Sequence, residues 1–431
     1  MAKLRWLQVN KFRTVKPGTR LTFNPGYNVL LGQNGTGKTT LLNLVSAVVR
    51  SDFHEFEEIE FDLEYELEST DAGTVTFAVR QQRSAEPLLS ELEPLPPEVL
   101  TASTLAEESG LRRPVFSACL RFTPAPSGAP ISLTIKGSSM TVQAADERPG
   151  GPPSPFDVPE GRTLRGLIGF GLLQGIRSRQ QPPLPPSSPA LLRLVWEEST
   201  SRFDESLEHF NSLRNLSCEA RRAADASLSG PPTLAEFYPP LLEQLEQRWG
   251  ADRYILGDEQ IPFLKEAVRY LDFQSAEAIF ELLEASGADS MKLGNLKFLF
   301  THRGGWRIAE KQLSYGQKRM LAFLHYLTTV RSVAIADELV NGLHHRWIRA
   351  SIEALGERQV FLTSQNPLLL DYLTFESPEE VHRTFVLCRW EQGSEQMVWE
   401  NMSQEAAEDF FDSYKVGFQQ VGELLQTKGL W

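Results

Sequence analysis

The chain has 431 residues, 41% of them hydrophobic and 23% charged, so it can bury at least one large core and has the composition of an ordinary globular protein. Its 43 basic and 56 acidic residues give a net charge of −13, which argues against non-specific nucleic-acid binding as its main role without excluding a local basic patch. Three widely spaced cysteines, an N-terminus without a signal-peptide core and the lack of an apolar run of roughly 18 residues predict a cytoplasmic protein without a membrane helix.

The N-terminal residues 3–31 predict two strands, because two apolar stretches are separated by turn residues. The turns are Lys16-Pro17-Gly18 and Asn24-Pro25-Gly26, and the second apolar stretch ends at Leu31. A glycine-rich loop follows, and apolar residues at helical spacing then predict a helix from Lys38 to about Val49.

The loop between this strand and this helix has the pattern Gly32-x-x-x-x-Gly37-Lys38-Thr39, the phosphate-binding P-loop. Its glycines allow left-handed backbone, so that successive N–H groups converge on phosphate oxygens at a helix N-terminus. Lys38 is expected to reach the β- and γ-phosphates, and the Thr39 hydroxyl to bind Mg²⁺. The sequence therefore predicts an ATP site with Mg²⁺ formed by Gly32, Gln33, Asn34, Gly35, Thr36, Gly37, Lys38, Thr39 and Thr40.

Residues 55–145 have alternating or β-branched composition joined by short turns, which predicts an antiparallel sheet beside the nucleotide core. The expected strands are Glu57–Glu68, Thr74–Arg80, Val115–Phe122 and Ile131–Gln143. The Ser84–Pro97 stretch is predicted to be loop and short helix. Two Gly- and Pro-rich intervals, 148–155 and 181–186, are interpreted as linkers on either side of a helix at Thr163–Arg179.

The next hundred residues, Pro189 to about Gly287, have helical periodicity and predict a compact helical insertion lobe. The candidate helices are Leu191–Asn211, Pro232–Arg248 and Pro262–Ala285. The sequence is thus divided into residues 1–146 with the P-loop, 147–290 with the linkers and insertion, and 291–431 with the remaining motifs.

The last part of the chain alternates strands and helices. Expected strands are Leu296–Phe300, Gly305–Ile308, Ser332–Ala336, Gln359–Thr363, Arg383–Trp390 and Gln396–Trp399, and expected helices are Tyr315–Val330, His345–Leu355, Gln404–Phe411 and Tyr414–Thr427.

Two further motifs lie in this part. Ser314, Gly316 and Gln317, in the run Leu313–Arg319, open a helix and provide a hydroxyl and backbone N–H groups suited to an anion. The apolar strand Val333–Ala336 ends in Asp337 and Glu338, at the strand end where ligands bind in open α/β sheets. Asp337 is expected to hold Mg²⁺ through water, and Glu338 to act as general base toward the attacking water.

This order of motifs resembles the ABC-type ATPases, with LSYGQ at 313–317 in place of the usual LSGGQ. The flanking runs Asn10–Arg13 and Asp337–His344 resemble the RecF/SMC/OLD branch, including its small prokaryotic members. The resemblance covers residues 1–50 and 291–373. It implies an α/β fold with an ABC-type ATPase core, to which the antiparallel β subdomain and the helical insertion are added.

The resemblance also implies how ATP is bound. In this family two subunits meet head to tail, so Lys38 and its loop would bind ATP in one protomer while Ser314, Gly316 and Gln317 of the other contact the γ-phosphate. Asn341 would belong to the dimer-contacting D-loop. Arg13 resembles an arginine near the nucleotide, although an ordinary surface arginine is an equal alternative. Gln81 and Gln82 are both candidates for the Q-loop glutamine.

One position departs from the family pattern. After the strand Gln359–Leu362 the family usually has a histidine that contacts the γ-phosphate, and here the corresponding residue is Gln365. Glutamine can donate a hydrogen bond but carries no charge. We therefore predict slower or more tightly gated hydrolysis, and a gain in turnover for Gln365→His.

The leading functional hypothesis is a Mg²⁺-dependent ATPase that acts as a regulatory switch for a separate effector protein, by analogy in bacterial anti-phage defence. One alternative is a RecF-like DNA-binding clamp, which requires a positive stripe despite the net charge. Another is a nearly inactive scaffold whose ATP-bound dimer only holds a partner. A membrane-transporter motor is the least favoured hypothesis.

Overall fold

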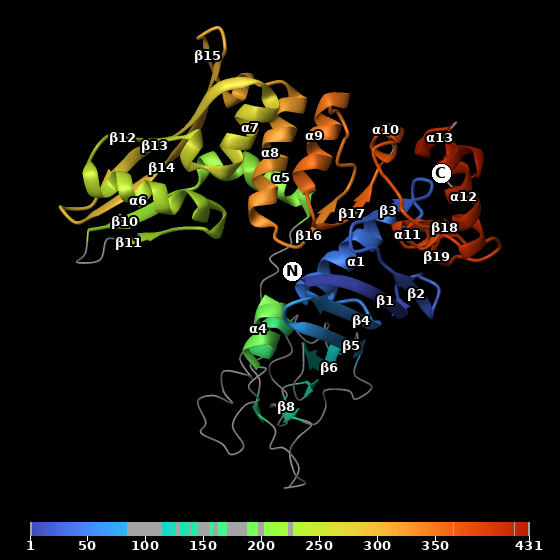
Figure 1. Cartoon of the computed structure of the whole chain (residues 1–431). Helices are drawn as coiled ribbons and strands as arrows, with labels where there is room; N and C mark the ends of the chain where they lie inside the picture. Colours follow the sequence, from blue (N-terminus) through green and yellow to red (C-terminus); the bar gives the residue numbers. More distant parts are fainter. Residues whose placement is uncertain are drawn as a thin grey trace, which may run out of the picture. The chain divides into compact units, whose positions relative to one another are not determined.

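The computed structural model describes residues 2–83, 114–125, 130–137, 139–144, 156–157, 163–169, 188–196, 202–222, 227–364, 366–417 and 419–429 (Figure 1). The chain forms two compact units, each assembled from distant parts of the sequence. The first, here called the P-loop unit, comprises residues 1–25, 31–198 and 379–406, and the second, the signature unit, comprises 26–30, 199–378 and 407–431. The division of the sequence at residues 146 and 290 stays a prediction.

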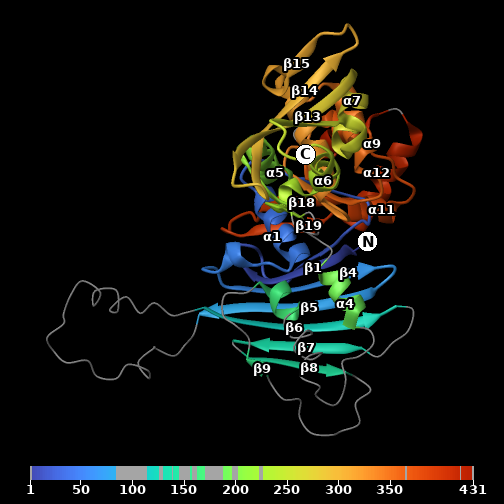
Figure 2. The same ribbon diagram turned by 90° about the vertical axis from the view of Figure 1, so that its left-hand side faces the viewer.

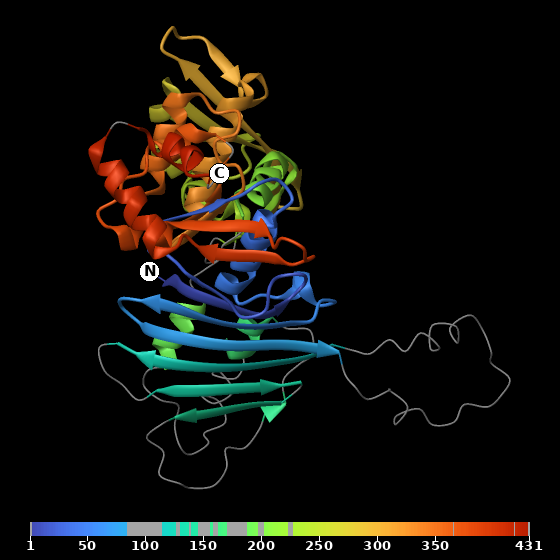
Figure 3. The same cartoon turned by 90° about the vertical axis from the view of Figure 1, so that its right-hand side faces the viewer.

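The described part of the P-loop unit contains an eight-stranded antiparallel sheet in the order β2-β1-β4-β5-β6-β7-β8-β9 (Figure 2 and Figure 3). Its strands are β1 (Ala2–Phe12), β2 (Thr19–Thr22), β4 (Phe61–Ser69), β5 (Gly73–Arg83), β6 (Pro114–Pro124), β7 (Ile131–Lys136), β8 (Ser139–Ala144) and β9 (Phe156–Asp157). Apolar side chains alternate along β4, where Leu63, Tyr65 and Leu67 are buried. The Tyr65 ring stacks on Phe77 of β5 at 4.5 Å.

The predicted antiparallel sheet is therefore confirmed, with two corrections. The strand expected from Glu57 begins only at Phe61, because residues His54–Phe56 form a 3₁₀ turn (η1) that continues to Ile59. The single strand expected at Ile131–Gln143 is a hairpin, because Gly137 turns the chain with φ +54°. Of the predicted helix Thr163–Arg179, residues 164–169 are helical and Thr163 is not. Residues 170–179 lie outside the described residues, as do 84–97, 148–155 and 181–186.

The P-loop unit also holds the P-loop helix α1 (Lys38–Arg50), the helices α4 (Ser188–Trp196) and α11 (Pro378–Thr384), and a hairpin of β18 (Phe385–Trp390) and β19 (Met397–Asn401). The side chain of Asn401 fixes this hairpin to β2, since its Oδ1 accepts a hydrogen bond from Thr22 N–H at 2.9 Å. Its Nδ2 donates to Thr22 O at 2.8 Å. The two predicted C-terminal strands are thus present, the first beginning two residues later than expected because α11 extends to Thr384.

The signature unit has a parallel core in which β16 (Val333–Ala336), β17 (Gln359–Thr363) and β3 (Tyr27–Leu31) are neighbours in that order. Every residue of β16 and β17 is buried, as expected for parallel strands covered on both faces. The helices α8 (Tyr315–Thr329) and α9 (His345–Leu355) connect the motifs. Because the strands are parallel, the end of β3 that leads into the P-loop lies at the same sheet edge as the ends of β16 and β17.

A second sheet of the signature unit has the order β11-β10-β14-β13-β12, and β15 also pairs with β14. Its strands are β10 (Cys218–Arg221), β11 (Ser227–Ser229), β12 (Arg253–Gly257), β13 (Phe273–Ala285), β14 (Ser290–His302) and β15 (Arg307–Ala309). The helices of this region are α5 (Phe203–Ser212), α6 (Tyr238–Gln247) and α7 (Pro262–Leu271), with short 3₁₀ turns η2 (Leu213–Asn215), η3 (Pro232–Phe237), η4 (Asp258–Gln260) and η5 (Glu310–Gln312). In Figure 1, α5, α7 and α8 lie beside this sheet.

The insertion is therefore mixed α/β and not a purely helical lobe. The single helix expected over Leu191–Asn211 is two helices, α4 and α5. The helix expected from Pro232 begins as the 3₁₀ turn η3 and continues as α6, and the one expected over Pro262–Ala285 ends at Leu271. Asp272 adopts a left-handed conformation, φ +62°, and caps α7. In the run that follows, Ala276, Ala278 and Phe280 are buried at the alternating spacing of a strand. An apolar run this short is compatible with a helix or a strand when only the sequence is considered.

The C-terminal part of the signature unit contains α10 (Pro367–Leu370), α12 (Gln404–Val416) and α13 (Val421–Thr427). The helix expected at Tyr414–Thr427 is interrupted, because Gly417 has φ +72° and ends α12. Among the described residues, no helix combines the length and the apolar character needed to cross a membrane.

Candidate nucleotide site

The P-loop curls around its own lysine. Gly32, Gly35 and Gly37 have φ of +143°, +81° and +86°, as the predicted left-handed turns require. Lys38 Nζ donates hydrogen bonds to Gly32 O at 2.6 Å and to Gln33 O at 2.9 Å. Gly37 is the N-cap of α1 and offers no side chain to cap its first N–H groups, which is the arrangement of an anion-binding helix N-terminus.

The loop rests on the β18–β19 hairpin. A Cβ atom on Gly32 would lie 2.1 Å from Cys388 O, and one on Gly37 would lie 2.5 Å from Met397 Sδ. Trp390 Nε1 donates to Gly35 O at 3.2 Å. These hairpin residues were not predicted to support the P-loop, since nothing in the sequence relates them to residues more than 350 positions earlier.

The thiol of Cys388 lies in this contact and is buried. Burial raises the pKa of Cys388 to about 12, while the positive charge of Lys38 acts in the opposite direction. The thiol is therefore neutral near pH 7 and fills space beneath the loop. Trp399 of the same hairpin is buried as well, and among the described residues its Nε1 has no hydrogen-bond partner.

Arg13 follows β1 with φ +45°, and its guanidinium lies over the rings of Phe12 and Phe56, 5.6 Å and 6.0 Å from their centroids. Its role at the nucleotide stays a prediction. Gln81 is buried, and its amide donates to Phe56 O at 2.9 Å and to Ile59 O at 3.2 Å, which fixes the η1 turn. Of the two Q-loop candidates, Gln82 has the exposed side chain.

The signature motif forms the start of α8 as predicted. Ser314 is the N-cap, its Oγ accepts from Gln317 N–H at 3.3 Å, and Gln317 Oε1 accepts from Ser314 N–H at 2.9 Å. This capping box gives Gln317 a structural role in addition to its predicted one. Ser314 is exposed, whereas Gly316 is buried.

The start of α8 packs on the segment after the acidic pair. A Cβ on Gly316 would lie 2.8 Å from the Trp347 ring and 3.0 Å from Gly342 O. Gly342 has φ +74°, and a Cβ there would lie 2.6 Å from the ring of Tyr315, which is 64% exposed. The start of α8 and the segment after the acidic pair are therefore tightly packed together in the signature unit.

Asp337 and Glu338 follow β16, and Thr363 of β17 binds both. The register pairs Ala336 with Leu362, which brings the next residues of the two strands together. Thr363 Oγ1 accepts a hydrogen bond from Glu338 N–H at 2.9 Å and donates to Asp337 Oδ1. Glu338 has φ +48°, a left-handed conformation that is uncommon outside glycine. Asn341 Nδ2 donates to Glu338 Oε2 at 3.2 Å.

The sequence placed Thr363 at the strand end but assigned it no function. Gln365, two residues after Thr363, lies outside the described residues, so its predicted contact with the γ-phosphate is untested. The described residues contain no group of three or more His, Cys, Asp and Glu side chains that could hold a metal. The assignment of Thr39 and Asp337 as magnesium ligands stays a prediction.

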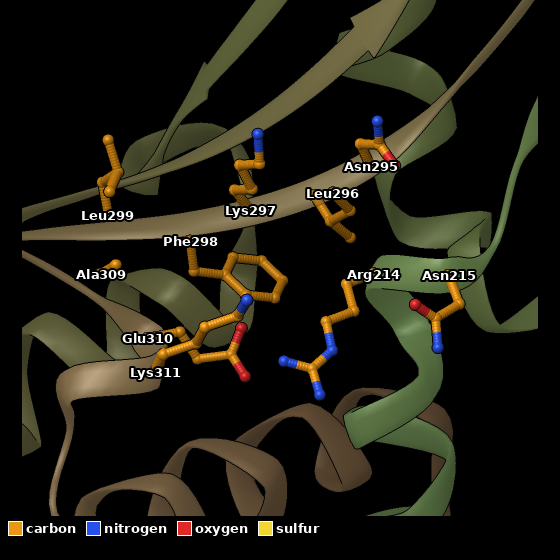
Figure 4. A pocket seen from close by; sticks show the side chains of 10 residues that line it. All are labelled: Arg214, Asn215, Asn295, Leu296, Lys297, Phe298, Leu299, Ala309, Glu310 and Lys311. Atoms are coloured by element: carbon orange, nitrogen blue, oxygen red, sulfur yellow. The ribbon is translucent and has the colours of Figure 1, made fainter. Parts of the chain in front are cut away.

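A cavity of about 770 Å³ lies beside η5, immediately before the signature helix (Figure 4). Figure 4 shows Phe298 of β14 on one side and Arg214 of η2 on the other, with Glu310 and Lys311 from η5. Burial raises the pKa of Glu310, while the charges of Arg214, Lys318 and Lys311 oppose this shift. The sequence did not predict this cavity, because three separate segments form it.

Two protein-family models match the chain. The model described as "AAA domain" matches residues 7–84, which include the P-loop. The model described as "AAA domain, putative AbiEii toxin, Type IV TA system" matches residues 168–371, which include the signature motif and the acidic pair. A comparison with curated proteins finds no match.

Among solved structures, the chain is similar to the SMC head domain from Thermotoga maritima, with 12% identity over 93% of this chain and 99% of the other, and a TM-score of 0.39. It is also similar to the Smc head domain of Pyrococcus furiosus with an extended coiled coil, at 11% identity, 96% and 100% coverage and a TM-score of 0.36. A third similar structure is the recombination mediator protein RecF, at 12% identity, 93% and 98% coverage and a TM-score of 0.32.

The two family matches contain all three motifs described above, in the chain order P-loop, signature helix and strand-borne Asp-Glu pair. On these grounds, residues 7–84 and 168–371 are two parts of an AAA-type P-loop ATPase domain.

Proposed function

We propose that this protein is a Mg²⁺-dependent ATPase whose active sites are completed in a head-to-tail dimer, and that it acts as a switch for a separate effector protein. The observation that carries the proposal is Glu338, held in a left-handed conformation beside Asp337 at the end of a buried parallel strand. Strained residues of this kind persist where the surrounding contacts fix them, and they cluster at active sites.

The predicted P-loop, metal, base and signature residues have roles in this proposal. The P-loop N–H groups and Lys38 bind the phosphates, and Thr39 and Asp337 would hold Mg²⁺, which neutralises phosphate charge when bound. Glu338 accepts the proton of the attacking water as the bond between the γ-phosphate and ADP breaks. The exposed Ser314, at the N-terminus of α8, would contact the γ-phosphate bound by the partner protomer.

The composite site is tested by light scattering of Glu338→Gln protein with and without Mg-ATP. Loss of the base leaves ATP bound but not hydrolysed, so the mass is expected to double when ATP is added. Ser314→Arg in the same background places a large side chain at the start of α8 and should keep the protein monomeric. A mass that ATP leaves unchanged, from a monomer that binds ATP, would contradict dimer-completed sites.

The ATPase itself is tested by phosphate release. The wild-type protein should hydrolyse ATP, and Glu338→Gln should remove at least about 99% of the turnover, as expected when a general base is lost. Turnover that survives the substitution would mean that another group activates the water.

The regulatory part of the proposal draws on the description of one matched family model, "AAA domain, putative AbiEii toxin, Type IV TA system". It predicts that the gene lowers phage plating only together with a neighbouring effector gene. The P-loop variant Lys38→Met, expressed at the same level, should restore plating. Unchanged phage resistance in that variant would separate any defence role from ATP binding.

A further inference from the structure

We propose that Arg319 is a positioning residue that holds Glu338 in its catalytic conformation and couples it to the signature helix. The inference deepens the proposed ATPase function and rests on it. Arg319 was not singled out in the sequence, where it is one of two adjacent basic residues after the LSYGQ run.

Arg319 is a buried cation, 9% exposed, on the inner side of α8. Its Nη2 donates to Glu338 O at 2.7 Å and its Nε donates to Leu339 O at 3.2 Å. The guanidinium also lies 5.1 Å from the centroid of the Phe203 ring. Among the described residues, no carboxylate lies within ion-pair distance of it, so its polar contacts serve the turn after β16.

These contacts add to the other restraints on Glu338. Its N–H is bound by Thr363 and its carboxylate by Asn341, and its carbonyl accepts from both Arg319 and the Asn341 N–H, the latter at 3.0 Å. The left-handed conformation is unfavourable for a residue with a Cβ, so surrounding contacts must hold it. The planar guanidinium binds two successive carbonyls at once, and it therefore fixes the peptide planes on both sides of Leu339, the first of which also carries the Cα of Glu338.

The same residue connects Glu338 to the predicted γ-phosphate contact. Arg319 lies five residues after Ser314 on α8, about 7.5 Å along a rigid helix. A phosphate that shifts the start of α8 must therefore shift the guanidinium as well. Arg319 thereby lets engagement of the signature motif set the orientation of the general base.

The experiment compares Arg319→Met and Arg319→Lys with the matched control Arg358→Met. Arg358 is half-buried and its guanidinium also donates to backbone carbonyls, Val330 O at 3.0 Å and Leu327 O at 3.1 Å, but at the other end of α8. Each variant is measured for thermal stability, ATP affinity, kcat and KM.

Arg319→Met should lower kcat about tenfold or more while ATP affinity and KM change less than about twofold, because the P-loop is untouched. Arg319→Lys keeps the positive charge, and its kcat should lie between those of Arg319→Met and the wild type. Arg358→Met should lose comparable stability and keep the wild-type kcat. Wild-type kcat in folded Arg319→Met, or an equal loss of kcat in both methionine variants, would overturn the inference.

Amide hydrogen exchange supplies a readout that does not depend on ATP. Arg319→Met should accelerate exchange at Asn341, whose N–H is bonded to Glu338 O, and Arg358→Met should not. If the wild type hydrolyses no ATP, the proposed function fails, whereas the exchange result still decides whether Arg319 holds this turn. Unchanged exchange at Asn341 in Arg319→Met would overturn the positioning role.

Discussion

At the scale of single residues, Gly32 occupies a position that excludes any side chain. Its φ is +143°, and a Cβ would lie 2.1 Å from Cys388 O, a backbone atom that cannot rotate away. We expect Gly32→Ala to abolish ATP binding and to lower the free energy of unfolding by more than the roughly 1–2 kcal/mol of a left-handed alanine. Denaturant unfolding and ATP titration measure both.

The matched control is Gly18→Ala. Gly18 has φ +79° but no atom within 4 Å of its Cβ position, so it isolates the conformational cost from the clash. Equal destabilisation by the two substitutions would show that the Cys388 contact does not restrain the loop.

Thr363 allows a second prediction at this scale. It is 1% exposed, and its hydroxyl joins the Glu338 N–H to the Asp337 carboxylate. Thr363→Val keeps the shape but leaves the N–H without its acceptor, at a cost of roughly 1–3 kcal/mol. We expect phosphate release to slow by about tenfold or more, since 1.36 kcal/mol corresponds to tenfold in rate.

Thr363→Ser is the conservative control, because it keeps the hydroxyl and removes only a methyl group. It should retain most of the activity in the same assay. A valine variant as active as the serine variant would mean that the hydroxyl does not orient the acidic pair.

At the scale of secondary-structure elements, β16 depends on one tyrosine of α8. The Tyr326 hydroxyl accepts from Ile335 N–H at 2.8 Å and donates to Ile335 O at 3.2 Å, and both residues are fully buried. Tyr326→Phe leaves two backbone groups without this partner, and we expect the free energy of unfolding to fall by roughly 1–3 kcal/mol. Denaturant titration checks this.

The control for this prediction is Tyr238→Phe. The Tyr238 hydroxyl binds one carbonyl, Pro231 O at 2.8 Å, in a half-buried position where water can replace it. Tyr238→Phe should therefore lower the free energy of unfolding by less than Tyr326→Phe does. A larger decrease for Tyr238→Phe would mean that other groups replace the Tyr326 hydroxyl as hydrogen-bond partners of Ile335.

The burial of Cys388 in the β18–β19 hairpin gives a prediction about the reactivity of the three cysteines. Burial raises the pKa of Cys388 to about 12 and that of Cys218 to about 11, from an ordinary value of 9.0, whereas Cys119 is exposed. At pH 8 iodoacetamide should therefore modify Cys119 well before the other two, as read by mass spectrometry. Rapid modification of Cys388 would show that the hairpin opens from the P-loop.

The same two pKa shifts determine whether the free energy of unfolding rises or falls at alkaline pH. Unfolded thiols lose protons near pH 9.0, while the folded ones keep them until about 11 and 12. Between these values the native state binds more protons, so the free energy of unfolding falls as pH rises. Replacing both buried cysteines by alanine should flatten this part of the pH profile.

Elements were predictable where the periodicity was long or repeated. The helix at His345–Leu355 and the strand at Gln359–Thr363 have the expected ends, and α8 differs by one residue. The strand β13 was mistaken for helix because its apolar run fits both periods, and pairing with β12 and β14 decided the outcome.

At the scale of the whole molecule, ATP should stabilise the fold. A ligand at about one hundred times its dissociation constant adds about 2.7 kcal/mol to the free energy of unfolding of a protein that binds it only when folded. We expect Mg-ATP to raise the melting temperature of Glu338→Gln protein, which cannot consume it. Differential scanning fluorimetry measures the shift.

Lys38→Met in the same background is the control, because it removes the cation that binds the phosphates and should remove the shift. Stabilisation that survives in this variant would place ATP binding elsewhere in the chain. The net charge of −13 opposes non-specific binding of this anion.

The sequence by itself determined the motifs and their local structures: the P-loop turn, the N-cap of α8 and the acidic pair at the end of β16. It could do so because glycine spacing, helix capping and buried strands act over a few neighbouring residues. Only the tertiary structure decided that Thr363 and Arg319 hold Glu338 and that the β18–β19 hairpin supports Gly32. Those contacts join residues 19 to more than 350 positions apart, and their pairing depends on strand register and packing that no local pattern records.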